Sequence, residues 1–505
     1  METVLTPSQM AAIDRQAIAS GVSEATLIGR AGAAVAWHAR RMLGGTYGGR
    51  VVVVVGKGNN GADGRVAAGL LARWGAGVDV VELTDPPDTR RLGRVLDRCD
   101  LAIDAMFGTG FRGELDGVAA TIDEELYRAP LILSVDIPSG VDGATGEIRG
   151  DGFVGGAVLA HETVTFGAYK PGLLFEPGRF HAGTVTVADI GLPIASPRLA
   201  PGSTVLWTEP DVADAPLERW PQDHKWSSAV VVVGGSPGMT GAPLFAARAA
   251  QRCGSGMVVV TAPGVDAANR MSGTEVVVTA VSGSAKSRID ESSVAEVIDT
   301  AKRAKTVVVG PGLGRKPGTE RAVRSLIARL AMPIVVDADA LHAIGTDYGV
   351  LFERDASGAP PAILTPHDGE YRVLTGRAVG DDRLGAARSL ASATRCVVLL
   401  KGPATVVAGP DGRAAIVANG GSELATAGTG DVLCGVIAAL CARMHHLAGA
   451  HDEVAHDVVA TVASAAWIHA AAGRAAALGP STIASDVVAA LPSTLERLRR
   501  GEHTT

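Results

Sequence analysis

The sequence predicts an α/β protein built as two domains, each with a parallel sheet that carries helices on both faces. Short apolar runs alternate with helical segments along most of the chain, as expected for buried parallel strands. The chain has 64 Gly residues and only 4% aromatic residues, a bias that suits the tight strand-to-helix turns of such folds. At 505 residues it exceeds one ordinary hydrophobic core, so length alone predicts two or three domains.

The first half begins with an Ala-rich segment, residues 8–43, which predicts one or two helices that end near Gly44. Apolar strand patterns follow at residues 51–55, 78–83, 101–105 and 131–135, and a helix is expected over 65–74. Because helical segments separate these short runs, the strands are expected to be parallel.

A change in composition and in apolar periodicity divides the chain into two parts. Residues 201–221 are Pro-rich and weakly periodic, so we predict a linker there between a domain of residues 1–200 and a second of residues 222–505. In the second domain the expected strands are 230–233, 257–261, 307–309, 334–336, 363–365, 397–400 and 405–407. The last long apolar pattern is predicted to be a helix that begins at Asp431.

Charge and composition limit the partners and the compartment. The net charge is −7 and the chain has no long run of Lys or Arg, which argues against nucleic acid. The N-terminus shows no apolar signal region, and the most apolar late stretch, residues 458–473, is too short to span a bilayer. Five scattered cysteines without a CxxC pair indicate reduced thiols. We therefore expect a cytoplasmic homo-oligomer with small-molecule substrates and no membrane partner.

The first candidate site is the segment GKGNNGADG, residues 56–64, predicted to join a strand to a helix. It formally matches the dinucleotide fingerprint, with Glu82 further along the chain, and backbone N–H groups at a helix start bind phosphate. A plain tight turn and an ordinary dehydrogenase loop are both alternatives. Asn59, Asn60 and Asp63, however, place polar groups where a dehydrogenase needs only small ones.

Further polar residues fall at the ends of later predicted strands. Asp104 and Asp136 each end such a strand, and Ser139 follows three residues after the second. In a parallel sheet these positions share the carboxyl edge, where ligands bind. Amide, hydroxyl and carboxylate oxygens suit a hard monovalent cation better than zinc. The alternative for each Asp is simple capping of the next helix.

The order NNGAD, DAMFGTG and DIPSG resembles the NAD(P)HX epimerase domain, and residues 169–193 resemble its closing segment, so the resemblance covers residues 8–200. It implies a Rossmann-like three-layer α/β/α domain, with Asp136 as the acid/base residue that inverts the hydrated carbon. One departure is Ala62, where the family usually has Gly. Potassium would be held by Asn60, Asp104 and Ser139. The hydrated cofactor would contact Asn59, Asn60, Gly61, Ala62, Asp63, Gly108, Thr109, Gly110, Phe111, Arg112, Gly113, Glu114 and Asp136.

The second candidate site is ATAGTGDVLCG, residues 425–435, which puts Gly428, Gly430 and Asp431 at a helix start. Glycine-rich backbone there forms an anion hole for a transferring phosphoryl group. Asp431 is then placed to take the proton from an attacking hydroxyl, which suits a reaction that depends on positioning and electrostatics. The alternative is a capped buried helix whose Asp lies at the positive end of the dipole.

This second motif resembles the ribokinase-like superfamily, and its neighbours narrow the likeness to the NAD(P)HX dehydratase domain. The neighbouring motifs are residues 224–250, 307–314, 335–341, 365–370 and 401–407, so the resemblance covers residues 222–495. Departures are Trp226, where the family more often has Gly, and Met239, where an aromatic residue is expected. The nucleotide would contact Lys401, Gly402, Pro403, Ala404, Thr405, Gly428 and Gly430. The hydrate would contact Ala242, Gly314, His367 and Asp431, although a satisfied loop histidine is the alternative for His367.

The two resemblances together imply repair of hydrated NADH and NADPH. The first domain would interconvert the R and S hydrates, and the second would dehydrate the S-hydrate at the expense of ADP, giving NAD(P)H, AMP and phosphate. K⁺ would serve the first site, and Mg²⁺ would bridge the nucleotide phosphates in the second. Two alternatives stay open: a small-molecule kinase fused to a dinucleotide-binding domain, and a first domain that only binds.

Overall fold

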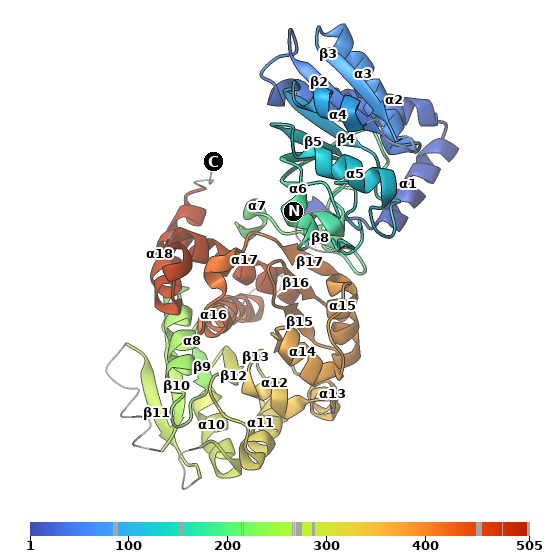
Figure 1. Ribbon diagram of the computed structural model, residues 1–505. Coiled ribbons are helices and arrows are strands. Elements are labelled where there is room, and N and C mark those ends of the chain that lie inside the picture. The colour runs from blue at the N-terminus through green and yellow to red at the C-terminus, as the bar shows by residue number, and fades with distance from the viewer. Residues whose placement is uncertain are drawn as a thin grey trace. The chain divides into compact units, whose positions relative to one another are not determined.

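The computed structural model describes the whole chain except residues 84–88, 151–155, 214, 216, 265, 267, 269–274, 285–287, 451–456, 477 and 502–505. The chain forms two compact units, an N-terminal unit of Glu2–Pro197 and a C-terminal unit of Arg198–Thr505 together with Met1. Figure 1 shows both units, coloured along the chain.

The N-terminal unit is built on a six-stranded, wholly parallel sheet in the order β3-β2-β4-β5-β6-β7. The strands are β2 (Arg50–Val55), β3 (Gly77–Glu82), β4 (Leu101–Ala105), β5 (Ile132–Val135), β6 (Glu162–Phe166) and β7 (Thr184–Ala188), and β1 (Glu2–Thr3) precedes them. The helices are α1 (Pro7–Ala19), α2 (Glu24–Met42), α3 (Asn59–Arg73), α4 (Thr89–Leu96), α5 (Gly117–Leu126) and α6 (Gly178–Ala182), with a 3₁₀ turn η1 (Pro171–Leu173).

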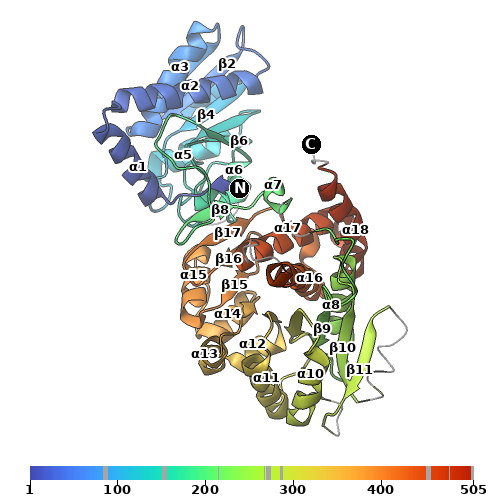
Figure 2. The same ribbon diagram turned by 180° about the vertical axis from the view of Figure 1, so that it is seen from behind.

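Alternate residues of β2 supply two separate cores, which makes this unit three layers thick. Val51, Val53 and Val55 pack with α2 and α3 on one face, whereas Val52 and Val54 pack with α4 and α5 on the other. Figure 2 shows α2 and α3 along this sheet. Side chains alternate between the faces of a strand, so a fully apolar run buries both. The predicted three-layer α/β/α arrangement is confirmed.

The C-terminal unit has a longer sheet, in the order β8-β17-β16-β15-β14-β13-β12-β9-β10-β11. Its strands are β8 (Thr204–Leu206), β9 (Val230–Val233), β10 (Val258–Pro263), β11 (Val277–Val281), β12 (Thr306–Val309), β13 (Ile334–Val336), β14 (Ile363–Leu364), β15 (Val397–Leu400), β16 (Thr405–Ala408) and β17 (Ala414–Val417). All neighbours are parallel from β11 to β15, and β16 is antiparallel to both β15 and β17.

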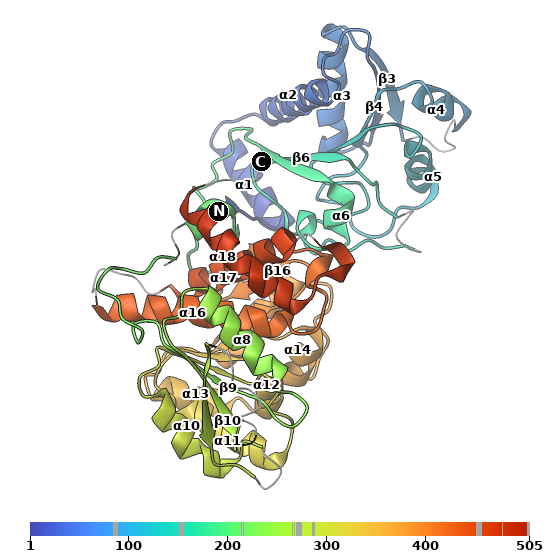
Figure 3. The same cartoon turned by 90° about the vertical axis from the view of Figure 1, so that its left-hand side faces the viewer.

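Helices lie on both faces of this sheet. Helices α8, α16, α17 and α18 lie together in Figure 3 and form one apolar core with the sheet. Helices α10 and α15 contact β9 and β15, respectively (Figure 1). The helices are α7 (Glu209–Val212), α8 (Gly241–Arg252), α10 (Val294–Ala301), α11 (Pro317–Arg329), α12 (Asp339–Ile344), α13 (Gly349–Ala356), α14 (Asp368–Thr375), α15 (Arg383–Thr394), α16 (Thr429–Ala450), α17 (Val458–Ala476) and α18 (Ala484–Arg499). Three 3₁₀ turns are η2 (Glu291–Ser293), η3 (Ser422–Leu424) and η4 (Gly479–Ser481).

Two sequence-based expectations about the C-terminal half differ from the structure. Residues 201–221, predicted as a linker, contain β8, which pairs with β17 and so belongs to the C-terminal sheet. The helix expected from Asp431 is not the last one, because α17 and α18 follow it. Helix α16 is long and apolar enough to cross a membrane, but 72% of its apolar window is buried inside the protein, as for a core helix.

Candidate active sites

Helix α3 begins at Asn59, directly after the Gly-rich turn, whereas the sequence predicts a start at residue 65. The prediction was wrong because glycine and asparagine are poor helix formers in isolation, and here packing decides. A Cβ at Gly61 would lie 2.0 Å from the Gly56 carbonyl oxygen, and one at Gly64 would lie 2.5 Å from the Ala105 side chain. The glycines therefore let the first turns of α3 rest directly on the strand ends.

Asn60, Asp104 and Ser139, the three predicted potassium ligands, meet at this edge of the sheet. Ser139 donates its hydroxyl to Asp104 Oδ1 (2.6 Å) and its backbone N–H to Asp104 Oδ2 (2.9 Å), and it accepts the Phe107 N–H (2.9 Å). Asn60 donates Nδ2 to the Phe107 carbonyl (2.9 Å). Its Oδ1 is buried and has no hydrogen-bond partner among the described residues.

A buried amide oxygen without a donor is unusual, because buried polar atoms are normally paired. The oxygens of Asn60, Phe107 and Ser139 are the kind of ligand that a hard cation takes. Asp104 already accepts several hydrogen bonds and so organises the cluster around Ser139. Within the described part of the chain, no group of three or more His, Cys, Asp or Glu side chains is placed to hold a metal ion.

Asp136 follows β5 and has a positive φ of 65°, which is uncommon for a residue other than glycine and concentrates at functional sites. Lys170, only 1% exposed, donates Nζ to Asp136 Oδ1 and to Thr165 Oγ1, each at 2.7 Å, and to the Phe166 carbonyl at 3.0 Å. Thr165 also donates to Oδ1 (3.1 Å). The other carboxylate oxygen of Asp136 is left without a hydrogen bond from the described residues.

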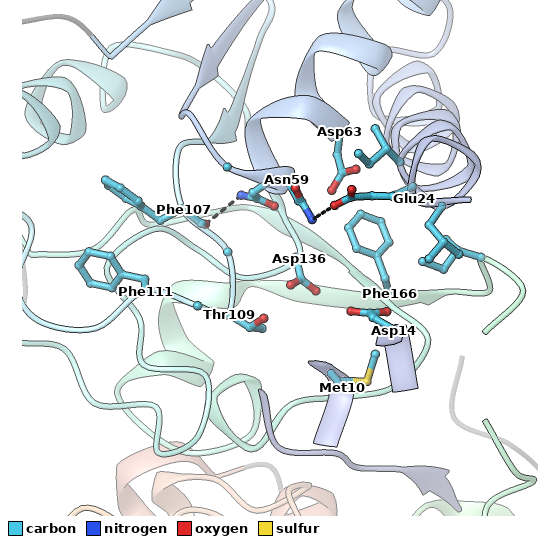
Figure 4. Close-up of a pocket in the computed structure, with 18 of the residues that line it drawn as sticks. Met10, Asp14, Glu24, Asn59, Asp63, Phe107, Thr109, Phe111, Asp136 and Phe166 are labelled. Carbon is cyan, nitrogen blue, oxygen red and sulfur yellow. Dashed lines mark hydrogen bonds between the residues drawn. The ribbon is translucent and has the colours of Figure 1, made fainter. Parts of the chain in front are cut away.

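Asp136 lines a cavity of about 670 Å³, into which Asp14 of α1 and Asp63 of α3 also point (Figure 4). Burial, with the charges of Asp136 and Asp14 acting in the same direction, raises the pKa of Asp63 to about 8. Burial also raises the pKa of Asp14, although Lys170 opposes this. At neutral pH the cavity therefore holds a protonated carboxyl, Asp63, opposite Asp136, which is the arrangement of an acid and a base.

The structure brings some of the predicted hydrate-binding residues to this cavity and leaves others away from its lining. Asn59, which donates to Glu24 (3.1 Å), lines the cavity, as do Asn60, Asp63, Gly108, Thr109, Gly110, Phe111 and Asp136. Gly61, Ala62, Arg112, Gly113 and Glu114 are not among its lining residues. Arg112 instead donates to the carbonyls of Thr109 (3.0 Å) and Phe111 (2.6 Å) of its own loop.

Sequence reasoning missed Asp14 and Lys170. Asp14 lies in the Ala-rich first helix, where nothing distinguishes it from a surface carboxylate. Lys170 interrupts the otherwise weakly charged segment before η1, and a lysine in such surroundings is a signal that could have identified it.

In the C-terminal unit the motif of residues 425–435 forms the start of α16. Gly428 has a φ of 92°, and a Cβ there would lie 3.0 Å from Ala484 and 3.1 Å from the Phe245 ring, so only glycine suits this turn. Thr429 secures the turn by donating its hydroxyl to the carbonyls of Leu424 (2.8 Å) and Thr426 (2.9 Å). Backbone N–H groups at the N-terminus of a long helix favour an anion.

Asp431 lies in the first turn of α16 beside a cluster of charged groups. Burial raises its pKa, Asp337 and Glu370 act in the same direction and Lys401 opposes them, and the net pKa is about 7. A carboxyl with a pKa near neutrality is suited to accept a proton at physiological pH.

Lys401 is the positive centre of this cluster. It donates Nζ to Asp337 Oδ1 (2.8 Å) and lies 3.5 Å from Glu370 Oε2. Burial would lower the pKa of Lys401, but Asp337 and Glu370 outweigh burial and raise it. Burial would likewise raise the pKa of Asp337, but Lys401 lowers it, so this pair is ionised. Lys401 was predicted to meet the nucleotide, and the structure adds that it also restrains the carboxylates around Asp431.

The remaining residues of the predicted nucleotide segment differ in exposure. Gly402 and Pro403 are exposed, Ala404 is buried, and Thr405 begins β16. Arg383 supports the turn: it donates to the Lys401 carbonyl (2.8 Å) and forms an ion pair with Asp368 (2.9 Å).

His367, predicted to contact the hydrate, is the N-cap of α14. Its Nδ1 accepts the N–H groups of Gly369 (2.9 Å) and Glu370 (3.3 Å), and its side chain is 59% exposed. Ala242 lies in the first turn of α8, and Gly314 has a φ of 78° and donates its N–H to Asp339 (2.8 Å).

The two departures from the dehydratase pattern, Trp226 and Met239, differ in their surroundings. Trp226 stacks against the Arg303 guanidinium, 3.9 Å from its ring centre, and Met239 is 49% exposed.

Comparisons with known proteins match each of the two units to a family. A family model described as NAD(P)H-hydrate dehydratase matches residues 230–493, and one described as YjeF-related protein N-terminus matches residues 24–94 and 86–172. A bifunctional NAD(P)H-hydrate repair enzyme of Moorella thermoacetica is 34% identical over 99% of this chain and 98% of that protein. A protein of the same name from Mycobacterium tuberculosis is 37% identical over 79% of this chain and 80% of its own length.

Among solved structures, an ADP/ATP-dependent NAD(P)H-hydrate dehydratase from Bacillus subtilis, co-crystallised with ATP and Mg²⁺, is 25% identical. It aligns with 58% of this chain and 98% of its own, with a TM-score of 0.47. The match along nearly the whole length of the Moorella protein, with one family model on each unit, decides the assignment. The chain belongs to the family of bifunctional NAD(P)H-hydrate repair enzymes, with a Rossmann-like N-terminal unit and a ribokinase-like C-terminal unit.

Proposed function

We propose that this chain repairs hydrated NADH and NADPH through two reactions at two separate sites. The N-terminal unit interconverts the R and S hydrates, and the C-terminal unit dehydrates the S-hydrate at the expense of ADP to give NAD(P)H, AMP and phosphate. Family membership along the whole chain supports the pairing of activities. The observation that carries the second activity is a carboxyl of near-neutral pKa, Asp431, at the glycine-rich start of α16.

In the N-terminal unit, the acid and the base of the epimerisation are Asp63 and Asp136. The hydrated carbon of the substrate is bonded to the ring nitrogen, whose lone pair stabilises the cation formed when the hydroxyl leaves as water. Asp63, protonated at neutral pH, gives the proton that makes water the leaving group. Asp136, oriented by Lys170, takes a proton from the water that adds to the opposite face. Each cycle inverts the carbon and restores both carboxyl groups by proton exchange with solvent.

Asn60, Ser139 and the Phe107 carbonyl fit a potassium ion, because the buried Asn60 Oδ1 has no other partner. When bound, K⁺ would supply a fixed positive charge beside the cavity that Asn60 lines. Gly108 lies against Asn60, so the loop that follows β4 would be held in place by the same cluster.

In the C-terminal unit, Asp431 takes the proton of the S-hydrate hydroxyl. The hydroxyl oxygen then attacks the terminal phosphorus of ADP, and the bond between that phosphorus and the bridging oxygen breaks to release AMP. The carbon–oxygen bond of the phosphorylated hydrate breaks next, inorganic phosphate leaves, and loss of the neighbouring C–H proton restores the ring double bond. Mg²⁺, when bound to the nucleotide phosphates, would neutralise their charge during the transfer.

The test is recovery of NADH absorbance when the protein is incubated with hydrated NADH and ADP. We expect recovery with the natural chain and none with Asp431→Asn, because the amide accepts no proton. Accumulation of a stable phosphoester instead of NADH would favour a small-molecule kinase.

We also propose the compartment, the partners and the oligomeric state of the enzyme. The charge of −7 and the five free cysteines, four of them buried, support a cytoplasmic enzyme that acts on small molecules without nucleic acid or membrane. We further propose that it is a homo-oligomer, which size-exclusion chromatography with light scattering would test.

A further inference from the structure

Asp14, on α1, is a carboxylate of the N-terminal cavity that neither gives nor takes a proton in the proposed epimerisation. It lines the cavity of about 670 Å³ and points into the same space as Asp63 and Asp136 (Figure 4). Among the residues that the structure describes, no hydrogen-bond or ion-pair partner holds its side chain. Polar groups inside a protein are normally paired, so this carboxylate is free to interact with the molecule that enters the cavity.

The groups around Asp14 leave its charge uncompensated. Burial raises its pKa, Lys170 opposes burial, Asp136 acts with burial, and Arg15 opposes both. The side chain is only partly buried, so solvent also supports the charged form. Lys170 donates Nζ to Asp136 Oδ1 at 2.7 Å, so its positive charge is already matched by a closer carboxylate. The negative charge of Asp14 is therefore left over beside this pair.

The cavity wall next to Asp14 is apolar. Met10 and Ile18 lie one helical turn before and after Asp14 on α1, so the three residues share one face of the helix, and all three line the cavity. Phe166, at the end of β6, lines it as well. Charges interact more strongly beside such a wall than in bulk water, because the surroundings screen them less.

We propose that Asp14 stabilises the positive charge that the nicotinamide-derived ring carries while the two hydrates interconvert, an inference that rests on the proposed epimerisation. When the carbon–oxygen bond breaks, both of its electrons leave with the oxygen, which takes the proton of Asp63 and departs as water. The lone pair of the ring nitrogen then forms a double bond to the carbon, and the two atoms share one positive charge. Water adds to the other face, gives a proton to Asp136 and so removes that charge.

The attraction between Asp14 and the ring exists only during this step, because the ring is uncharged in both hydrates. An interaction made only with the short-lived cation lowers the barrier without tightening the binding of either hydrate. The diphosphate of the substrate is anionic, so the charge of Asp14 does not favour the bound hydrate either. Removal of this charge should therefore lower kcat and leave KM unchanged or lower.

Steady-state rates of R-to-S interconversion without ADP test the proposal. Chiral chromatography measures them at pH 6.5, where Asp63 keeps its proton. Asp14→Asn, which has nearly the same shape without the charge, should lower kcat about 100-fold and should not raise KM. Asp14→Glu, which keeps the charge, should restore part of the lost kcat. Asp79→Asn, at an exposed position of β3, is the control and should behave as the natural chain does.

The oxidised cofactor provides a second measurement, because NADP⁺ carries a permanent positive charge on the ring that NADPH lacks. Used as competitive inhibitors of the interconversion, both compounds report on the N-terminal site alone. NADP⁺ should bind the natural chain about tenfold more tightly than it binds Asp14→Asn. NADPH should bind the two proteins about equally.

A natural kcat in Asp14→Asn, a loss that appears only as a higher KM, or an equal loss of affinity for NADP⁺ and NADPH would overturn the proposal. If no Asp14 variant folds, the natural chain still decides, since NADPH that inhibits as strongly as NADP⁺ would overturn it. A natural chain that does not interconvert the hydrates would overturn the proposed epimerisation and this inference with it. Interconversion that is unaffected by Asp14→Asn would overturn this inference alone.

Discussion

Replacing Asp431 with asparagine should remove the dehydratase activity and at the same time stabilise the C-terminal unit at alkaline pH. Asp431 has a folded-state pKa of about 7 against an ordinary value of 3.8. The folded chain therefore binds more protons than the unfolded chain between these values, and the natural protein loses stability as pH rises through that window. Below about pH 4 both states are protonated, and the contribution vanishes.

The size of the effect follows from the shift. About three pKa units at ~1.4 kcal/mol each amount to about 4 kcal/mol. Because part of Asp431 meets water, we expect about 2–4 kcal/mol at pH 8. For a unit of this size that is roughly 3–6 °C in the midpoint of its thermal transition.

Scanning calorimetry of Asp431→Asn and the natural chain at pH 5 and pH 8 measures this difference. The gain of the variant at pH 5 should be roughly 40% of its value at pH 8, because the carboxyl of the unfolded chain is already ionised at pH 5 whereas the folded-state pKa is about 7. Asp347→Asn is the control, because that side chain is 74% exposed and pairs with Arg324, so its loss should bring no gain. A gain for Asp431→Asn that is equal at both pH values, or a loss at pH 8, would refute the argument that Asp431 is a buried base.

Three further outcomes are expected. Lys170→Met should slow R/S interconversion at least 100-fold, because Lys170 orients Asp136, and should leave dehydration of the S-hydrate unchanged. Chiral chromatography of the two hydrates measures both rates, and an equal loss of both activities would contradict this prediction. Epimerisation should decline above about pH 8 as Asp63 loses its proton, and pH–rate profiles of Asp63→Asn should be slower at pH 7 and lack that alkaline limb. Arg354→Met should lower the free energy of unfolding by about 3 kcal/mol in denaturant titration, because the buried guanidinium donates to the carbonyls of Pro360 (2.9 Å) and Met332 (2.6 Å); an unchanged midpoint would show that water replaces it.

Local sequence pattern was sufficient for the valine-rich strands and insufficient for others, since β6, β7, β8, β11 and β17 were not predicted. Strands such as β2 and β9 are unbroken valine runs that bury both faces, so their pattern identifies them. The edge strand β7 (Thr184–Ala188) is only half-buried and mixes threonine with valine, and β8 falls in Pro-rich sequence. Such strands can be identified only from the strands that they pair with, and a single sequence does not show this pairing.

The candidate sites divide in the same way. Asp136 and Asp431 were predictable because each follows a recognisable turn at the end of a strand or the start of a helix. Lys170 and Asp14 come from segments distant in sequence and meet Asp136 only through the fold. The protonation states of Lys401 and of the carboxyl groups around it likewise depend on burial and on distances in the folded chain. The spacing of these residues along the sequence does not define either.

The central claim is that two separate sites act in turn, and chiral chromatography of R- and S-hydrated NADH tests it most directly. With ADP present, the natural chain should convert both epimers to NADH. Asp431→Asn should interconvert the epimers without forming NADH, and Asp136→Asn should consume only the S-hydrate and leave the R-hydrate to its slow spontaneous inversion. Continued NADH formation by Asp431→Asn, or full use of the R-hydrate by Asp136→Asn at the natural rate, would contradict the assignment of the two sites.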